Sequence, residues 1–280
     1  MERLLLSMLL VFVFYSCSKG QEVQQSQTMK LVWSDEFEYS GLPDDSKWDY
    51  EAGFVRNEEA QYYTKAREEN VKVEDGCLVI TGRKEKYKNP GYVKGSPKWQ
   101  LNREYAEYTS GSVITKDRLS VRYGRVEVKA KLSFGKGTWP AIWMLGDNIS
   151  QIGWPKCGEI DIMEFLGRES HRIYGTCHWG EENTGKHRSD GKHIDVTPVP
   201  SDDFHIYAIN WYPDRIEFFY DDLNYYTFEI GQAGENDDNA FRKPFYLLIN
   251  LALGGWGGEI DDSIIPQNYY IDYVRVYEFQ

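Results

Sequence analysis

Short segments in which apolar and polar residues alternate recur along the 280-residue chain, and this pattern constrains its fold most. Residues 124–132, "GRVEVKAKL", place Val126 and Val128 on one face and charged side chains on the other. Similar segments rich in aromatic and β-branched residues are 204–212, 215–220, 245–253 and 269–277. Turn residues separate them, and no segment keeps a helical period. We therefore predict an all-β antiparallel sandwich or barrel of the jelly-roll kind.

Composition narrows the class of partner. The chain has 44 acidic and 32 basic residues and a formal charge of −12, which repels nucleic acid and disfavours a polyanionic substrate. It also has 9 Trp, 21 Tyr and 13 Phe residues, which suit pleated sheets and sugar-stacking surfaces. A neutral carbohydrate is compatible with both features.

The first 19 residues read as an export signal. An apolar run of 12 residues, 4–15, is too short to span a membrane of about 30 Å but suits a signal peptide. Ser16 and Cys17 follow, an order that resembles a bacterial lipobox in which Cys17 becomes lipidated. Ordinary cleavage near Gly20 is the alternative. Residues 20–29 form a polar tether, and residues 30–280 form a single predicted domain.

The segment "GEIDIMEFLG", 158–167, carries three acids in an otherwise apolar run. On a straight strand, Glu159 and Asp161 share one face, whereas Glu164 would point into the core, where a lone carboxylate costs several kcal/mol. A β-bulge with Met163 as the surplus residue brings Glu164 back beside the other two acids. We therefore predict a bulged strand that presents all three carboxylates on one open face.

Such a row of acids has three interpretations. Isolated surface charges are common, but acids on one strand face repel each other. A calcium site needs 6–8 oxygen ligands around one ion, which carboxylates spread along a strand do not provide. A retaining glycosidase needs a nucleophile and an acid/base about 5–5.5 Å apart, which two Glu side chains on one strand face can reach. The third interpretation is favoured.

Nearby tryptophans support it. Trp139 and Trp143 lie four residues apart in "GTWPAIWMLG", and Trp154 follows. Indole faces stack on sugar rings, although core packing accounts equally well for any one of them. Three indoles beside a triple-acid strand indicate a carbohydrate site.

At this point a family resemblance appears. "GEIDIMEFLGRES" resembles the active-site signature of glycoside hydrolase family 16 in its bulged ExDxxE form. Other blocks match in order along nearly all of the mature chain: "LVWSDEF", "NEEAQYY", "DGCLVITG", "YTSG", "YGRVEVKAKL", "GTWPAIWMLG", "DFHIYAINW", "PFYLLINLALGG" and "IDYVRVYEF". The resemblance implies a concanavalin A-like jelly roll with a concave substrate cleft, and endo-acting, retaining cleavage of a polysaccharide.

The resemblance also assigns roles. It implies that Glu159 is the nucleophile, Glu164 the acid/base and Asp161 an electrostatic helper, without a catalytic cofactor. Substrate contacts are implied for Trp139, Trp143, Trp154, Asn57 and His178. A structural calcium ion, which many relatives hold on the convex side, is expected at Glu36, Gly76 and Asp272.

Within the family, the bulged motif is similar to laminarinases and β-1,3(4)-glucanases, and also to agarases, porphyranases and carrageenases. The acidic composition favours a neutral β-1,3 glucan, with or without β-1,4 links. A galactan hydrolase and a non-catalytic glucan-binding module are the alternatives. We expect a monomer with a glucan substrate, exported and held by a lipid anchor at the bacterial outer membrane or in the periplasm, or else secreted.

Two local features remain open. Cys157 and Cys177 flank neighbouring predicted strands, so they form either a disulfide or two buried free thiols. The stretch 84–108 is rich in Lys, Gly, Pro and Tyr, and we predict a long functional loop over the site, with disorder as the alternative.

Overall fold

A computed structural model describes residues 28–280. The predicted signal segment 1–19 with Cys17, and nearly all of the tether, lie outside the described residues. Across residues 28–280, no helix has the length and apolar character that a membrane crossing requires.

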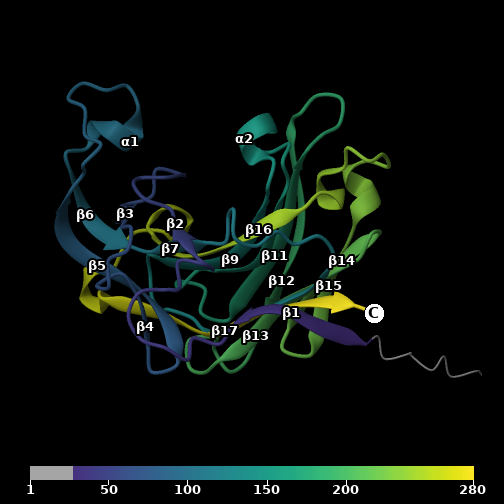
Figure 1. The fold of residues 1–280 in the computed structure, drawn as a ribbon. Coiled ribbons are helices and arrows are strands. Elements are labelled where there is room, and N and C mark those ends of the chain that lie inside the picture. The colour runs from purple at the N-terminus through teal and green to yellow at the C-terminus, as the bar shows by residue number, and fades with distance from the viewer. Residues whose placement is uncertain (1–27) are drawn as a thin grey trace, which may run out of the picture.

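Two sheets pack face to face, as Figure 1 shows, and confirm the predicted sandwich. The larger sheet has ten strands, and eight of them follow the order β15 (Leu223–Glu229), β14 (Arg215–Tyr220), β13 (His205–Trp211), β8 (Gly124–Lys131), β17 (Gln267–Phe279), β5 (Cys77–Lys88), β6 (Tyr105–Ser110) and β3 (Gln61–Tyr63). The other two are β1 (Met29–Asp35), which pairs with β17, and β4 (Val71–Glu74), which pairs with β5. Every pair is antiparallel except β3 with β6, which is parallel.

The smaller sheet has seven strands. Their order is β12 (His187–Asp195), β11 (Arg172–Gly180), β10 (Glu159–Phe165), β9 (Thr138–Gly146), β16 (Phe245–Leu253), β7 (Ser112–Ile114) and β2 (Asp49–Tyr50). Short helical turns occur only in connections: α1 (Trp99–Asn102), α2 (Ile149–Ile152), η1 (Ile230–Ala233), η2 (Ala240–Arg242), η3 (Gly255–Gly257) and η4 (Asp262–Ile264). This sheet carries the acidic strand β10 near its centre.

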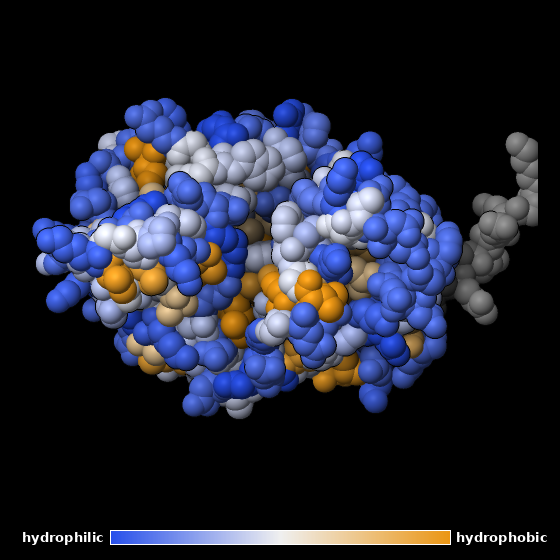
Figure 2. All heavy atoms as spheres, turned by 90° about the horizontal axis from the view of Figure 1, so that it is seen from above, coloured by the Kyte–Doolittle hydropathy of each residue, from blue (hydrophilic) through white to orange (hydrophobic). Residues whose placement is uncertain are grey.

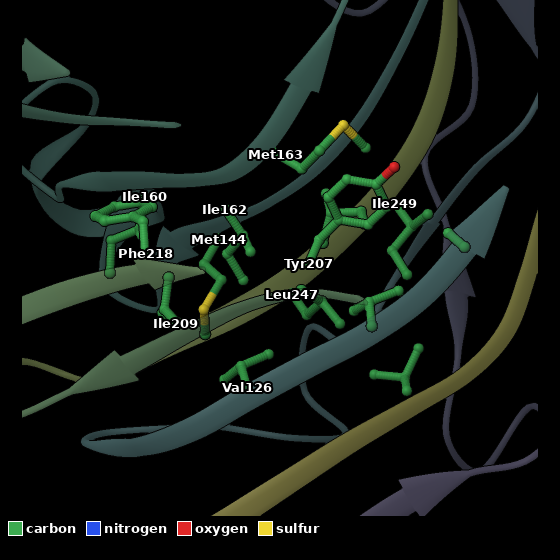
Figure 3. Packing of buried hydrophobic residues seen from close by; sticks show 14 of the residues in the cluster. Val126, Met144, Ile160, Ile162, Met163, Tyr207, Ile209, Phe218, Leu247 and Ile249 are labelled. Carbon is green, nitrogen blue, oxygen red and sulfur yellow. The ribbon is translucent and has the colours of Figure 1, made fainter. Parts of the chain in front are cut away.

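The core lies between the sheets, where inward-facing residues of both meet (Figure 3). Val126 of β8 and Ile209 of β13 come from the larger sheet, and Ile160 of β10 comes from the smaller one. All are fully or almost fully buried. Strand β16 is buried along its whole length, because its other face packs in a second apolar cluster with Trp143. The floor of the acidic face is therefore rigidly supported from below.

The predicted loop 84–108 is only partly a loop. Its first residues continue β5 to Lys88 and its last residues form β6, which pairs with β5. Cross-strand hydrogen bonds therefore order both ends, and only 89–104 is a connection, with α1 inside it. In Figure 1 this connection rises above the smaller sheet on one side, with α2 on the other.

Candidate active site

Strand β10 contains the predicted bulge. Asp161 pairs with Thr176 of β11. The next pair along is Glu164 with Tyr174, so three steps on β10 match two on β11. One extra residue therefore lies between the second and third acids, which confirms the bulge.

Two apolar residues occupy the bulge. Ile162 is 1% exposed and Met163 is fully buried, and both belong to the main core. Along β9, Met163 has the partner Ile142, whereas Ile162 has none. The surplus residue is thus Ile162 on that side, one position earlier than predicted. Because both side chains point inward, Glu164 turns outward to the same face as Glu159.

The three acids lie in a cleft on the outer face of the smaller sheet. Figure 2 looks down on this face, which is hollowed near its middle. The cleft has a volume of about 450 Å³. Its lining includes all three acids and four of the five predicted contact residues, namely Asn57, Trp139, Trp143 and Trp154. The sequence thus predicted the centre of the cleft, which strands β9 and β10 supply.

Burial dominates the electrostatics of the acids. Together with the charge of Asp161, it raises the pKa of Glu159 to about 8. Burial also raises the pKa of Asp161, and it lifts the pKa of Glu164 well above its ordinary value, with added repulsion from the other two. The three groups therefore titrate as a coupled set, so a proton on one of them favours the ionised form of the others. Glu164 is suited to hold that proton.

His178, the fifth predicted contact, lies beside the acids rather than in the lining of the cleft. It sits directly opposite Glu159 on β11. Its Nε2 atom is 3.0 Å from Oδ2 of Asp161 and 3.8 Å from Oε1 of Glu159. Ligand atoms of these three side chains lie within 4.8 Å of one another. However, the shortest contact has the length of a hydrogen bond, so His178 and Asp161 already satisfy each other.

Trp139 and Trp154 hold the two glutamates. The indole N–H of Trp139 donates to Oε1 of Glu164 at 3.2 Å. A hydrogen bond from Trp154 lowers the pKa of Glu159, against the larger effect of burial. Trp154 is 49% exposed, so one indole face is open to a ligand. Both indoles can therefore orient a carboxylate and contact a sugar ring.

Trp143 is less open than predicted. It is only 7% exposed, and the guanidinium of Arg56 lies over its ring at 4.7 Å. Its indole N–H donates to Asn250 at 2.7 Å. Arg56 also forms an ion pair with Glu51. Trp143 therefore presents only the edge of its indole ring to the cleft, and its face is not free to stack on a sugar.

Arg56, Glu51 and Glu59 line the cleft, and the sequence reasoning missed all three. Glu59 is 3% exposed and accepts hydrogen bonds from Asn57 at 3.2 Å and from Gln61 at 2.7 Å. Burial raises the pKa of Glu59. A signal existed, since Arg56 directly precedes Asn57 and Glu59 falls in the quoted block "NEEAQYY".

The carboxylates expected to bind calcium are already paired with cations. Glu36 accepts two hydrogen bonds from Arg275, at 3.0 and 2.8 Å, and this contact lowers its pKa. Asp272 pairs with Lys129 at 2.7 Å. Gly76 has only backbone oxygen to offer. As arranged here, the two side chains do not fit a calcium site, which needs carboxylate oxygens free for the ion.

Cys157 and Cys177 are both free and fully buried. Of the two alternatives, the structure has buried thiols. Burial raises the pKa of both, which leaves them protonated and unreactive at neutral pH.

Known proteins resemble both the sequence and the fold. A beta-glucanase from Rhodothermus marinus is 41% identical over 283 aligned residues, which cover 96% of this chain and 93% of that protein. The X-ray structure of the laminarinase from Rhodothermus marinus superposes with a TM-score of 0.78 at 41% identity, covering 91% of this chain and 100% of that one. A structure from work on endo-acting O-glycanases, which prominent members of the human gut microbiota express to initiate mucin breakdown, has a TM-score of 0.84 at 37% identity, covering 90% and 91%.

The sequence profile described as Glycosyl hydrolases family 16 matches residues 58–275. This range contains the bulged strand β10, the paired strand β11 and the indoles of the cleft. Together with the relatives above, this match identifies the family to which the chain and its row of three acids belong. This chain belongs to glycosyl hydrolases family 16.

Proposed function

We propose that the chain is an endo-acting, retaining glycoside hydrolase that cleaves β-1,3 glucan. The observation that carries the proposal is the bulge in β10, which puts Glu159, Asp161 and Glu164 on one face of an open cleft. Two glutamates on one strand face suit the separation of about 5–5.5 Å that double displacement requires. A binding module would gain nothing from three closely spaced, mutually repelling acids.

The first step transfers the glycosyl group to the enzyme. Glu164, whose pKa burial raises, donates its proton to the glycosidic oxygen, and the aglycone leaves. The carboxylate of Glu159 attacks the anomeric carbon from the opposite face and forms a glycosyl ester. Asp161 lies between them and repels negative charge on Glu164, which favours the protonated acid.

The second step releases the sugar. Glu164, now ionised, removes a proton from water, which attacks the anomeric carbon and displaces Glu159. His178 donates to Asp161 and stays near Glu159, where it lowers the pKa of the nucleophile. All these roles belong to side chains of this chain, and neither calcium nor a cofactor enters either step.

A neutral glucan suits the cleft. Trp139 and Trp154 supply indole surface, while Arg56, Asn57 and Glu59 supply hydrogen-bonding groups for hydroxyls. The similarity to a beta-glucanase and to a laminarinase supports the same substrate class, with mixed β-1,3-1,4 glucan as a further substrate.

The test is release of reducing ends by residues 28–280 from laminarin, mixed-linkage β-glucan, agarose, κ-carrageenan and mucin O-glycans. We expect cleavage of laminarin, alone or with mixed-linkage glucan, and loss of nearly all turnover in Glu159→Ser with binding retained. Cleavage of only a galactan or of mucin glycans would keep the mechanism and replace the substrate. Binding without cleavage of any polymer would favour a glucan-binding module.

We further propose that the protein is exported and anchored by a lipid on Cys17, with 30–280 as a single catalytic domain that acts as a monomer. The support is the apolar run followed by "SCSKG" at the N-terminus. Metabolic labelling with a fatty acid should mark the wild-type chain and not Cys17→Ser. Label on both, or on neither, would contradict the anchor.

A further inference from the structure

A second histidine, His187, lies behind His178 and away from the acids. His187 is on β12, where Gly180 of β11 faces it directly. His178 is two residues from Gly180 on β11, so His187 and His178 are diagonal neighbours on one face of the paired strands. Its Nε2 atom lies 2.8 Å from Nδ1 of His178, which is the length of a hydrogen bond.

The two rings and Asp161 form one chain of contacts. The ring planes of the histidines are 22° apart with centroids 5.1 Å apart, so the rings meet edge to edge. His178 then continues to Asp161 through its other nitrogen, Nε2, at 3.0 Å. Trp154 packs on His187 with ring centroids 4.7 Å apart, which restrains the exposed ring. This series of contacts therefore runs from the protein surface to Asp161, the acid between the two glutamates.

Each of these two hydrogen bonds contains one proton. If Nε2 of His178 donates to the carboxylate of Asp161, a neutral His178 has a bare Nδ1 that must accept a hydrogen bond. A neutral His187 can fill this contact in either direction, because its Nε2 atom donates to the bare Nδ1 of a neutral His178 or accepts from the Nδ1–H of a protonated one. In both cases the contact fixes the His178 ring with Nε2 directed at Asp161.

We infer that His187 is a positioning residue that holds the His178 ring oriented toward Asp161, beside the two catalytic glutamates. The inference rests on the proposed glycosidase function of the same site. Burial, with the neighbouring His178, lowers the pKa of His187, which keeps this ring neutral and able to fill the role near pH 7.

Few other charges reach the pair. On β10, Glu159, Asp161 and Glu164 all interact with His178. From the turn before β10, Lys156 packs against Gly180. Beside His187, Arg188 and Glu181 pair with each other at 2.6 Å.

The test compares His187→Phe with His187→Gln. Phenylalanine keeps a ring against Trp154 but has no donor, whereas the glutamine amide can still donate. His193→Phe makes the same change on the same strand outside the pair and serves as the control. Imidazole titration by NMR reads His178 directly, and kcat/KM against pH reads its effect on the reaction.

In His187→Phe we expect the NMR titration of His178 to change, because its Nδ1 atom loses the hydrogen-bond partner that fixes the ring. The dependence of kcat/KM on pH should change with it, since His178 contacts Asp161 and Glu159. At pH 7, kcat should fall about five-fold with KM unchanged, since the support of the catalytic acids rather than a sugar contact is altered. His187→Gln and His193→Phe should match wild type.

An unchanged His178 titration in His187→Phe would overturn the inference, as would an equal shift in His193→Phe. The titration needs no substrate, so it decides the inference even if the wild-type protein cleaves no glucan. Absence of cleavage would instead overturn the proposed function. The two failures are therefore distinguishable.

Discussion

The indole nitrogen of Trp139 lies 3.2 Å from Oε1 of Glu164 and links the neighbouring strands β9 and β10 at the acid/base. A donor at this distance favours the ionised carboxylate and lowers the pKa of Glu164 against the larger effect of burial. Trp139 thus affects the proton on Glu164 as well as the surface of the cleft.

Trp139→Phe should move the alkaline limb of kcat/KM to higher pH, because Glu164 loses a donor to its ionised form. We also expect kcat/KM on laminarin to fall about ten-fold, in line with the loss of one hydrogen bond to a charged group. The measurement is a pH series, with Trp33→Phe on the larger sheet as control. A shift of the limb to lower pH would contradict the assignment of this contact.

Glu164→Gln should separate the two proposed steps. The amide has no proton of suitable acidity, so laminarin hydrolysis should fall by about 10³-fold or more. An aryl glycoside whose leaving group needs no protonation should still form the glycosyl-enzyme, and azide should speed its release. Equal losses on both substrates would mean that Glu164 is not the proton donor.

The buried acids should make stability depend on pH. The folded-state pKa of Glu164 is raised, so the folded protein keeps a proton that the unfolded chain releases above about pH 4.5. The stability of the native state therefore falls as pH rises from there toward the folded pKa. Glu164→Gln should unfold at a higher temperature than wild type at pH 8 and at a similar temperature at pH 4. Thermal unfolding at both values checks this, and an equal difference at the two would refute it.

The ion pairs at Glu36 and Asp272 predict that chelators leave the thermal stability of the protein unchanged. Because Arg275 and Lys129 already neutralise these carboxylates, EDTA should shift the unfolding midpoint by less than about 1 °C. Arg275→Ala, which frees Glu36, provides the comparison. A drop of several degrees in EDTA that calcium restores would show that an ion binds here despite the pairs.

The local pattern of apolar and polar residues was enough to predict the strands and the face on which the three acids lie. Alternation along 124–132 and 269–277 indicated sheet faces, because side chains on a strand point to opposite sides in turn. The same rule made Glu164 inconsistent with a straight strand and so predicted the bulge. The register of β10 against β11 confirms it. The sequence alone therefore determined the fold class and the row of three carboxylates.

Contacts between distant segments were decided only in the tertiary structure. Arg56 covers Trp143 across 87 positions of sequence, and Arg275 of β17 reaches Glu36, which follows the neighbouring strand β1. His187 meets His178 because the antiparallel register of β11 and β12 makes them diagonal neighbours. Periodicity specifies which face a side chain takes, but not which strand lies beside it. That choice depends on the packing of the whole sandwich, since each strand's partner is set by burial of both sheets at once.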